Sequence, residues 1–438
     1  MRNIQTKIFS ILFSVTLFGS LISCEGPSSD NSAAAALLGL DIPASASKPQ
    51  FLNRYAELAF ESYTQAELDA SNLAAAVATF DSTATPSASD LTNLRNLWVK
   101  ARASYLITEG FRFSGGPIDT DTVLDCEPTG TASQPHDCEG LLNAWPLDED
   151  AVDAYINNGG NSVTTFSSIY GEIGDTNLGG EAEPQEDKIV LTGYHPIEYL
   201  LWGKDTSNTG AGDRLSSYFA DATGNGARRR HYLKTITDRL VVHLGLIKDH
   251  WDPANTGNFR ETFLDSANVN TSVGNIFQGL GSFMAGEWGG ERLTGVIGET
   301  QEEEHSCFSD TTKADFYYDA QGVLNIWTGN YSIQKGVNVS TGPGLSAILS
   351  FKQQGSIQAE IEKSRNLFCI NLADTESQDP NFRTSCPAGS LTHRFDQAIS
   401  SADSQHGILV NVQRLIGSTL NRDFVAAAAA IGFSVVPE

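Results

Sequence analysis

Apolar residues recur along this chain at the spacing of an α-helix. In the segment 89–109, Leu94, Trp98, Ala101 and Tyr105 follow one another at steps of four, three and four residues. Such steps place side chains on one stripe of a helix, whereas a strand alternates at every second residue. The pattern predicts a helix over 89–109, with a serine or aspartate available to cap its start.

The same period continues in later segments. Ile236, Leu240, His243 and Ile247 form a stripe in a helix expected to run from about 233 to 251. His243 on such a stripe is interpreted as a core histidine with its hydrogen bonds satisfied. Further helices are expected at 55–80, 276–287, 343–371 and 391–432. The sequence therefore predicts an all-α protein.

Polar loops divide the helical segments. Stretches rich in Gly, Asp and Ser occupy 114–140, 171–187 and 203–227. A chain of 438 residues is long enough for two packed units. We therefore place a boundary in the last loop, between an N-terminal bundle over about 51–215 and a C-terminal bundle over about 226–435.

The first 23 residues have the pattern of an export signal. Arg2 and Lys7 precede an apolar run over 8–22, which has the length of a signal-peptide core and is short for a membrane span. The residues Leu-Ile-Ser-Cys at 21–24 resemble a bacterial lipobox. This resemblance implies cleavage before Cys24 and lipid attachment to it, with an ordinary signal peptide as the alternative.

The segment 24–50 is rich in Ser, Ala and Pro and is interpreted as a tether behind the lipidated Cys24. The expected location is the bacterial cell envelope, with the chain anchored to a membrane, most simply the outer membrane. The formal net charge of −25 argues against nucleic acid as a partner, because phosphate binding needs clustered Lys and Arg.

Export also places the remaining cysteines in an oxidising compartment. Cys126 and Cys138 flank one polar loop, and Cys369 and Cys386 flank another. Pairing within each loop is the favoured arrangement and leaves Cys307 free, although other pairings are possible.

The most informative motif is Gly-Tyr-His-Pro-Ile-Glu-Tyr-Leu-Leu-Trp-Gly at 193–203. His195 and Glu198 stand three residues apart, so on a helix they share one face and can bind one metal ion. Pro196 favours the first helical position, which places His195 at or near the N-cap. The alternative role for Glu198 is to cap the backbone of its own helix.

Two protein ligands are few for a metal site, since catalytic zinc usually has three. Glu109 is the best third candidate because it lies close to the apolar stripe of its helix. An ion pair with Arg112 is the alternative. Glu287 and Glu291 are placed similarly on a later helix. His305 lies in an acidic run that ends at Asp310, and such runs are usually solvated loops.

These motifs resemble those of the imelysin-like family, which includes imelysin peptidases and iron-regulated protein A. The resemblance covers roughly 51–435 and includes, besides the His-x-x-Glu motif, the blocks 108–113, 116–119, 143–147, 277–282, 286–292 and 304–310 in family order. It implies two four-helix-bundle-like halves packed together with a groove between them. It also implies that Arg112, Glu287, Glu291 and His305 line the site.

The favoured function is iron uptake, with iron, haem or another divalent metal bound between the bundles and passed to iron-transport components. Imidazole and carboxylate groups suit iron. A metallopeptidase using His195 and Glu198 is the second hypothesis, although the sequence lacks His-Glu-x-x-His and has Tyr199 where a second histidine would be needed. A helical scaffold that docks a partner and binds no metal is the third.

Overall fold

The structure is a computed structural model that describes residues 41–126, 137–158, 190–220, 225–298, 301–333, 339–371, 379 and 381–437. The expected signal peptide, Cys24 and the first part of the tether lie outside these residues. Among the helices of the described residues, none combines the length and the hydrophobicity needed to cross a bilayer.

The described residues are helical, which confirms the all-α prediction, and their only β contacts are two isolated bridges. The helices of the first part are α3 (Lys48–Ser82), α4 (Ala88–Leu106), the 3₁₀ helix η1 (Ile107–Phe111), α5 (Cys138–Asn143), α6 (Glu149–Asn158), α8 (Tyr194–Trp202), α9 (Ser217–Ala220), α10 (Gly226–Trp251) and α11 (Phe259–Leu264).

The second part begins with α12 (Val269–Ser282), the π-helix η4 (Phe283–Arg292), α13 (Leu293–Ile297), η5 (Gln301–Glu303) and α14 (Thr312–Thr328). It continues through η6 (Leu345–Ile348), α15 (Phe351–Gln354), α16 (Ile357–Leu367), α17 (Phe395–Ala398), α18 (His406–Arg414), the π-helix η7 (Leu415–Leu420) and α19 (Asn421–Ala430).

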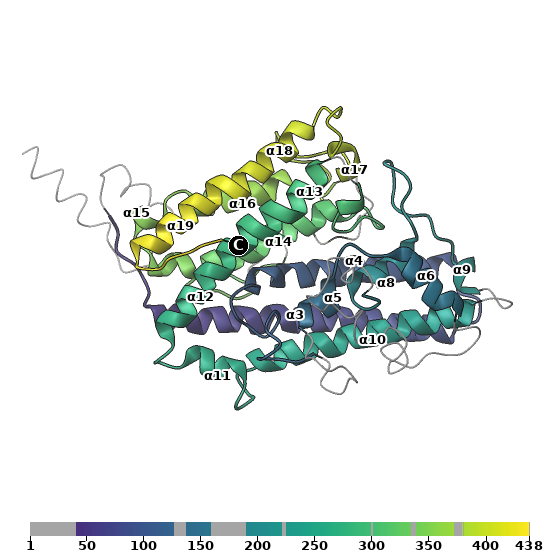
Figure 1. Ribbon diagram of the computed structural model, residues 1–438, viewed down its shortest axis with the longest axis horizontal. Helices are drawn as coiled ribbons and strands as arrows, with labels where there is room; N and C mark the ends of the chain where they lie inside the picture. Colours follow the sequence, from purple (N-terminus) through teal and green to yellow (C-terminus); the bar gives the residue numbers. More distant parts are fainter. Residues whose placement is uncertain are drawn as a thin grey trace, which may run out of the picture.

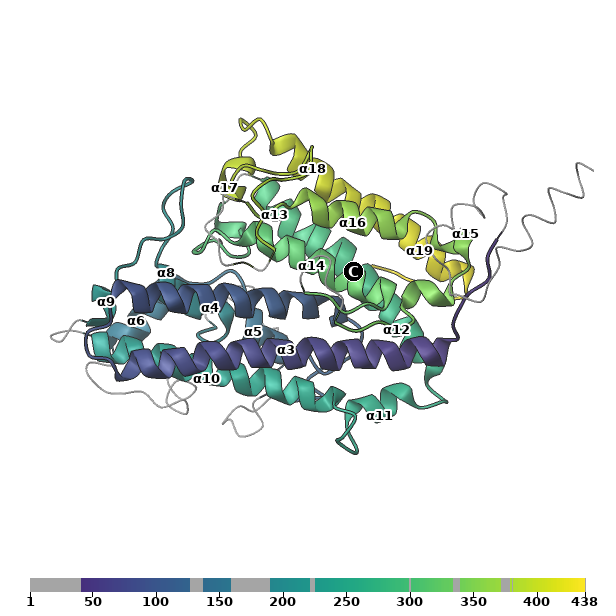
Figure 2. The same cartoon turned by 180° about the vertical axis from the view of Figure 1, so that it is seen from behind.

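These helices form two layers (Figures 1 and 2). In one layer α3 packs against both α4 and α10. In the other, α14 packs against α16, and η4 packs against η7. The sequence assigned α10 to the second bundle, but its apolar stripe packs on α3. The chain therefore changes layer after α10, later than the loop at 203–227.

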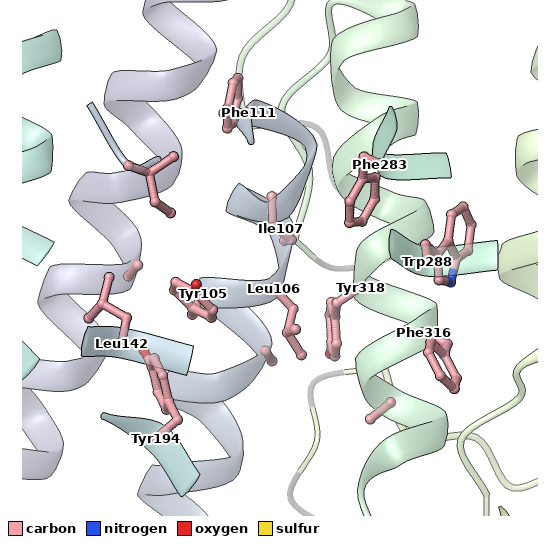
Figure 3. Close-up of a cluster of buried hydrophobic side chains, with 14 of the residues drawn as sticks. Tyr105, Leu106, Ile107, Phe111, Leu142, Tyr194, Phe283, Trp288, Phe316 and Tyr318 are labelled. Atoms are coloured by element: carbon pink, nitrogen blue, oxygen red, sulfur yellow. The ribbon is translucent and has the colours of Figure 1, made fainter. Parts of the chain in front are cut away.

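The two layers meet where α14 crosses α4 and η1. Figure 3 shows Leu106 and Ile107 on one side of this contact and Phe316 and Tyr318 on the other. The crossing is close: a Cβ added at Gly322 of α14 would lie 2.4 Å from the carbonyl oxygen of Ile107. A glycine is needed there because any side chain would push the layers apart.

Two disulfides close loops of the described chain. Cys126 is joined to Cys138, at the start of α5, and Cys369 is joined to Cys386. Cys307 is free and buried. These are the pairs that the sequence favoured.

Candidate functional site

The His-x-x-Glu motif lies in the first two turns of α8. The helix begins after Gly193, whose φ of 92° and close approach to the Leu142 carbonyl oxygen (2.5 Å from an added Cβ) require glycine. Pro196 is therefore the third helical residue, and His195 is the second, close to the N-cap as its spacing predicted. The first turn still tolerates the proline because its amides need no partner within the helix.

The side chains of His195 and Glu198 are fully buried and face each other. His195 Nδ1 lies 3.3 Å from Glu198 Oε2, and its Nε2 lies 3.2 Å from Asn143 Oδ1. The other carboxyl oxygen of Glu198 accepts hydrogen bonds from the amide (2.9 Å) and hydroxyl (2.6 Å) of Ser309. The partners of Glu198 are thus side chains and a distant loop, and not the start of α8.

The hydrogen bonds also determine where the protons lie. Arg102, which can only donate, donates to Asn143 Oδ1, so this atom is an acceptor. His195 Nε2 must then carry a proton. If His195 is neutral, its Nδ1 presents a lone pair to a protonated Glu198.

The ionisation of the two groups agrees with this assignment. Burial raises the pKa of Glu198 to about 8, despite the donors on Ser309 and the charge of Arg102. Burial and the neighbouring Arg102 lower the pKa of His195 well below its ordinary value. At neutral pH the metal-free pair is a neutral imidazole that accepts a hydrogen bond from a carboxylic acid.

A pH dependence of stability follows for the metal-free protein. Because the folded-state pKa of Glu198 is raised, its contribution is fully present below about pH 4.5 and is lost as the pH rises through 8. Glu198→Gln removes this titration, yet its amide can still accept from Ser309 and donate to His195. We expect the variant to gain up to about 4 kcal/mol relative to wild type between pH 4.5 and pH 8.

Urea unfolding at pH 5, 7 and 8.5 measures this gain. Asp150→Asn, at a carboxylate whose side chain is 87% exposed, is the matched control and should follow the wild-type curve. Parallel curves for Glu198→Gln and wild type would contradict the assignment of the proton to Glu198.

Glu109, the proposed third ligand, is held by arginine. One of its oxygens lies 2.5 Å from Arg292 Nη2 and 3.4 Å from Arg112 Nη1, whereas the other has no hydrogen-bond partner. Burial alone would raise its pKa, but Arg292 and Arg112 outweigh burial and lower the pKa to about 2. The carboxylate is thus an anion neutralised by two guanidinium groups.

Glu109 also does not converge with the His-x-x-Glu pair. In the described part of the chain, the only three acidic, histidine or cysteine ligands whose atoms lie within 4.8 Å of one another are Asp205, Asp310 and Asp396. Within the described residues, the pair on α8 therefore provides two ligands of these types to any shared ion.

The expected site-lining residues do meet in one pocket. Arg112, Glu287, Glu291 and His305 all line a cavity of about 360 Å³. Its wall also includes Asn143, Trp145, Glu139 and Arg292. His305 is buried, and its Nδ1 lies 3.2 Å from both Arg102 and Asp315. Residues 304–310 of the acidic run therefore turn inward, whereas Glu303 is exposed.

The wall of this pocket separates it from the pair on α8. Asn143 contacts His195 directly, and the rings of Trp145 and His305 lie 4.7 Å and 5.5 Å from the His195 ring. Since the same three residues line the pocket, His195 lies one side chain behind its surface.

The pocket is acidic. Its lining includes Asp137, Glu139, Glu287, Glu291 and Glu303. Its two cations are Arg112, which contacts Glu109, Asp119, Glu139 and Glu287, and Arg292, which contacts Glu109, Glu287 and Asp319. Burial raises the pKa of Glu139 to about 8, even though Arg112 opposes the shift. The remaining negative charge favours a cation over an anion in the pocket.

Sequence reasoning did not assign roles to Asn143, Trp145, Ser309 or Arg102. The first two lie in the block 143–147, and Ser309 lies in the block 304–310, so the family resemblance indicated these segments without their contacts. No sequence motif indicated the role of Arg102, because the apolar stripe of its helix does not predict partners that lie 41 and 213 residues away in the chain.

Comparison with known protein families decides the relationship. The family described as imelysin (peptidase M75) matches residues 59–420. The chain belongs to the imelysin family. No curated protein sequence matches it.

Two solved structures of imelysin-like proteins share this fold. A protein from Parabacteroides distasonis ATCC 8503, provisionally identified as an iron-regulated protein A precursor, superposes with a TM-score of 0.58 at 14% identity, over 88% of this chain and 97% of its own. An imelysin-like protein from Psychrobacter arcticum 273-4 gives a TM-score of 0.52 at 13% identity, over 90% and 99% of the two chains. At such low identity the similarity shows a common fold.

Proposed function

We propose that this imelysin-family protein is a lipid-anchored protein of the bacterial cell envelope that binds iron and takes part in its uptake. The observation that carries the proposal is the pair of ligand atoms on α8, His195 Nδ1 and Glu198 Oε2, which lie 3.3 Å apart behind an acidic pocket. In this proposal iron is cargo that the protein receives and releases.

The spacing of the two atoms suits a metal ion. An ion about 2.1 Å from each atom would subtend an angle of roughly 100° between them. Imidazole nitrogen and carboxylate oxygen are both ligands that iron accepts. The ion would replace the proton on Glu198, so binding should release a proton and should strengthen as the pH rises toward 8.

The charge of the pocket supports an ion or a cationic complex. Haem carries two carboxylates and a broad apolar face, whereas this lining is mainly charged and its arginines already have carboxylate partners. Within the described residues, no third acidic, histidine or cysteine ligand joins His195 and Glu198, which agrees with a site that gives up its ion. The relative from Parabacteroides distasonis, by its description as an iron-regulated protein, adds support.

Metallopeptidase activity remains the second hypothesis, and these residues fit it less well. Catalytic zinc usually has three protein ligands and a bound water, with a separate general base. Here Glu198 would have to be a ligand, and Glu109 is occupied by Arg292 and Arg112. The pair is also fully buried, so a peptide could not reach it without movement of the wall.

Iron content tests the proposal. Full-length protein in detergent is stripped with chelator, loaded with Fe²⁺ without oxygen, desalted and analysed by mass spectrometry for metal. We expect about one iron per wild-type chain and at least a tenfold weaker affinity, ~1.4 kcal/mol, for His195→Ala and for Glu198→Gln.

His393→Ala is the matched control, because His393 pairs with Asp403 away from the pocket and should bind iron as wild type does. Equal iron in wild type and in both α8 variants would refute the proposal. Chelator-sensitive cleavage of casein, lost in both variants, would favour the peptidase. If the wild-type protein neither binds iron nor cleaves casein, the scaffold hypothesis remains.

A further inference from the structure

A second cluster of acidic residues lies across the contact between the layers. Asp205 follows the C-terminal end of α8, Asp310 precedes α14, and Asp396 belongs to α17. One carboxylate oxygen of each lies within 4.8 Å of the others. The three residues are up to 191 positions apart in the chain, and none of them lines the pocket.

A fourth carboxylate points into this cluster. Glu304 is fully buried, neither of its oxygens meets an N–H or hydroxyl donor, and its carboxyl group lies within hydrogen-bond reach of the carboxyl group of Asp396 and close to Asp310. Both oxygens of Asp396 and one of Asp310 likewise meet no N–H or hydroxyl donor. A buried carboxylate without a donor is costly unless it is protonated or bound to a cation.

The donors around the cluster do not balance it. Arg394 pairs with Asp310 and, among the described residues, is the only guanidinium in contact with Asp310. Asp205 accepts from the amide of Ser207 and from the side chain of Gln301, both at 2.9 Å. Four carboxyl groups thus face one arginine, and the hydrogen-bond contact of Glu304 is with another carboxyl group, that of Asp396. The excess of negative charge over positive charge in the cluster is of the size that one divalent cation would neutralise.

We propose that Asp205, Asp310, Asp396 and Glu304 form a binding site for a hard divalent cation, Ca²⁺ in preference to iron. Ligands of one Ca²⁺ at about 2.4 Å can lie up to about 4.8 Å apart, and one oxygen of each of the three aspartates meets this limit. Glu304 lies outside that set of three and would join it through its contact with Asp396. The set consists of oxygen atoms only, which suits Ca²⁺, Mg²⁺ or Mn²⁺. The larger Ca²⁺ tolerates irregular geometry best.

The site is distinct from the iron pocket but shares a loop with it. His305 lines the pocket, whereas its neighbour Glu304 joins the acidic cluster. Ser309, which holds Glu198, directly precedes Asp310. A bound cation would join the loop after α8 to α17 in the other layer and would fix Ser309 beside Glu198. The inference does not depend on iron binding.

Calorimetric titration of the chelator-treated, full-length protein with CaCl₂ tests the site. We expect one Ca²⁺ per wild-type chain and a rise in melting temperature of at least about 2 °C at saturating Ca²⁺. The double variant Glu304→Gln/Asp396→Asn should bind Ca²⁺ at least tenfold more weakly. Asp150→Asn is the control, and its Ca²⁺ affinity should equal that of wild type.

The metal-free melting temperature provides a second readout. The amides of the double variant remove the repulsion between carboxylates, so we expect it to melt above metal-free wild type and to show no rise with Ca²⁺. No Ca²⁺ binding by wild type, or equal affinity in the double variant, would overturn the inference. Binding of iron in place of Ca²⁺ at these four residues would also overturn the inference. Loss of iron binding in the His195 and Glu198 variants tests only the proposed function.

Discussion

Replacing Arg292 with methionine is expected to lower the free energy of unfolding by about 3–5 kcal/mol, the usual cost of breaking a buried ion pair. Arg292 lies 2.5 Å from Glu109, 2.8 Å from Glu287 and 3.3 Å from Asp319. Glu109 and Asp319 are fully buried, and each already has one oxygen without a partner. Methionine preserves much of the side-chain volume but leaves these carboxylates short of positive charge.

Chemical denaturation at pH 7 measures the loss. Arg422→Met is the matched control, because Arg422 pairs with Asp423 on an exposed surface of α19 and should change the stability little. Equal stability of the two variants would show that the ion pairs of Arg292 do not fix the position of Glu109. Glu109 would then be available as a metal ligand.

Alanine at Gly322 is expected to lower the free energy of unfolding by roughly 2–3 kcal/mol, because overpacking outweighs the better helix propensity of alanine. Its Cβ would lie 2.4 Å from the carbonyl oxygen and 3.1 Å from the carbonyl carbon of Ile107, and backbone atoms cannot rotate away as a side chain can. The change separates α14 from η1, the contact that joins the two layers near Glu109 (Figure 3).

Gly407 supplies the control for this substitution. It lies in α18, and no heavy atom would approach an added Cβ within 4 Å. Gly407→Ala should therefore stabilise the protein by about 0.5–1 kcal/mol. Thermal melting of both variants gives the comparison, and a Gly322→Ala protein as stable as Gly407→Ala would contradict the close crossing of the layers.

The sequence predicted the helices over 55–80, 89–109 and 233–251 because their buried faces repeat locally, whereas 343–371 and 391–432 are each divided into several short helices. Leu94, Trp98, Ala101 and Tyr105 all lie buried on α4, as their spacing predicted. In the glycine-rich segment 276–287, an added Cβ at Gly279 would lie 2.7 Å from the Arg112 carbonyl oxygen, so the backbones pack closely there. The layer to which α10 belongs was not predictable, since a stripe shows that a helix is buried and not what buries it.

The candidate site was predictable in its residue types and less so in its pairing. His195 and Glu198 share a face because they are neighbours on one helix. The partners of Glu109 depend instead on Arg292, 183 residues away, and the local alternative with Arg112 was only part of the answer. Contacts between residues so far apart in the chain depend on how the two layers pack together, and the periodicity along one helix does not predict that packing.

The acidic cluster shows the same limit. Asp310 stood out as the end of an acidic run, but Asp205 and Asp396 occur in segments with no common motif. Only the fold brings their oxygens within 4.8 Å of one another.

Anomalous diffraction at the iron absorption edge, from crystals of the iron-loaded protein, tests the proposed function most directly. The account predicts one strong peak within about 2.3 Å of both His195 Nδ1 and Glu198 Oε2, on the side of the pocket. A peak at Asp205, Asp310 and Asp396, or beside Glu109 in place of Arg292, would contradict it, and so would iron-loaded crystals with no peak near α8.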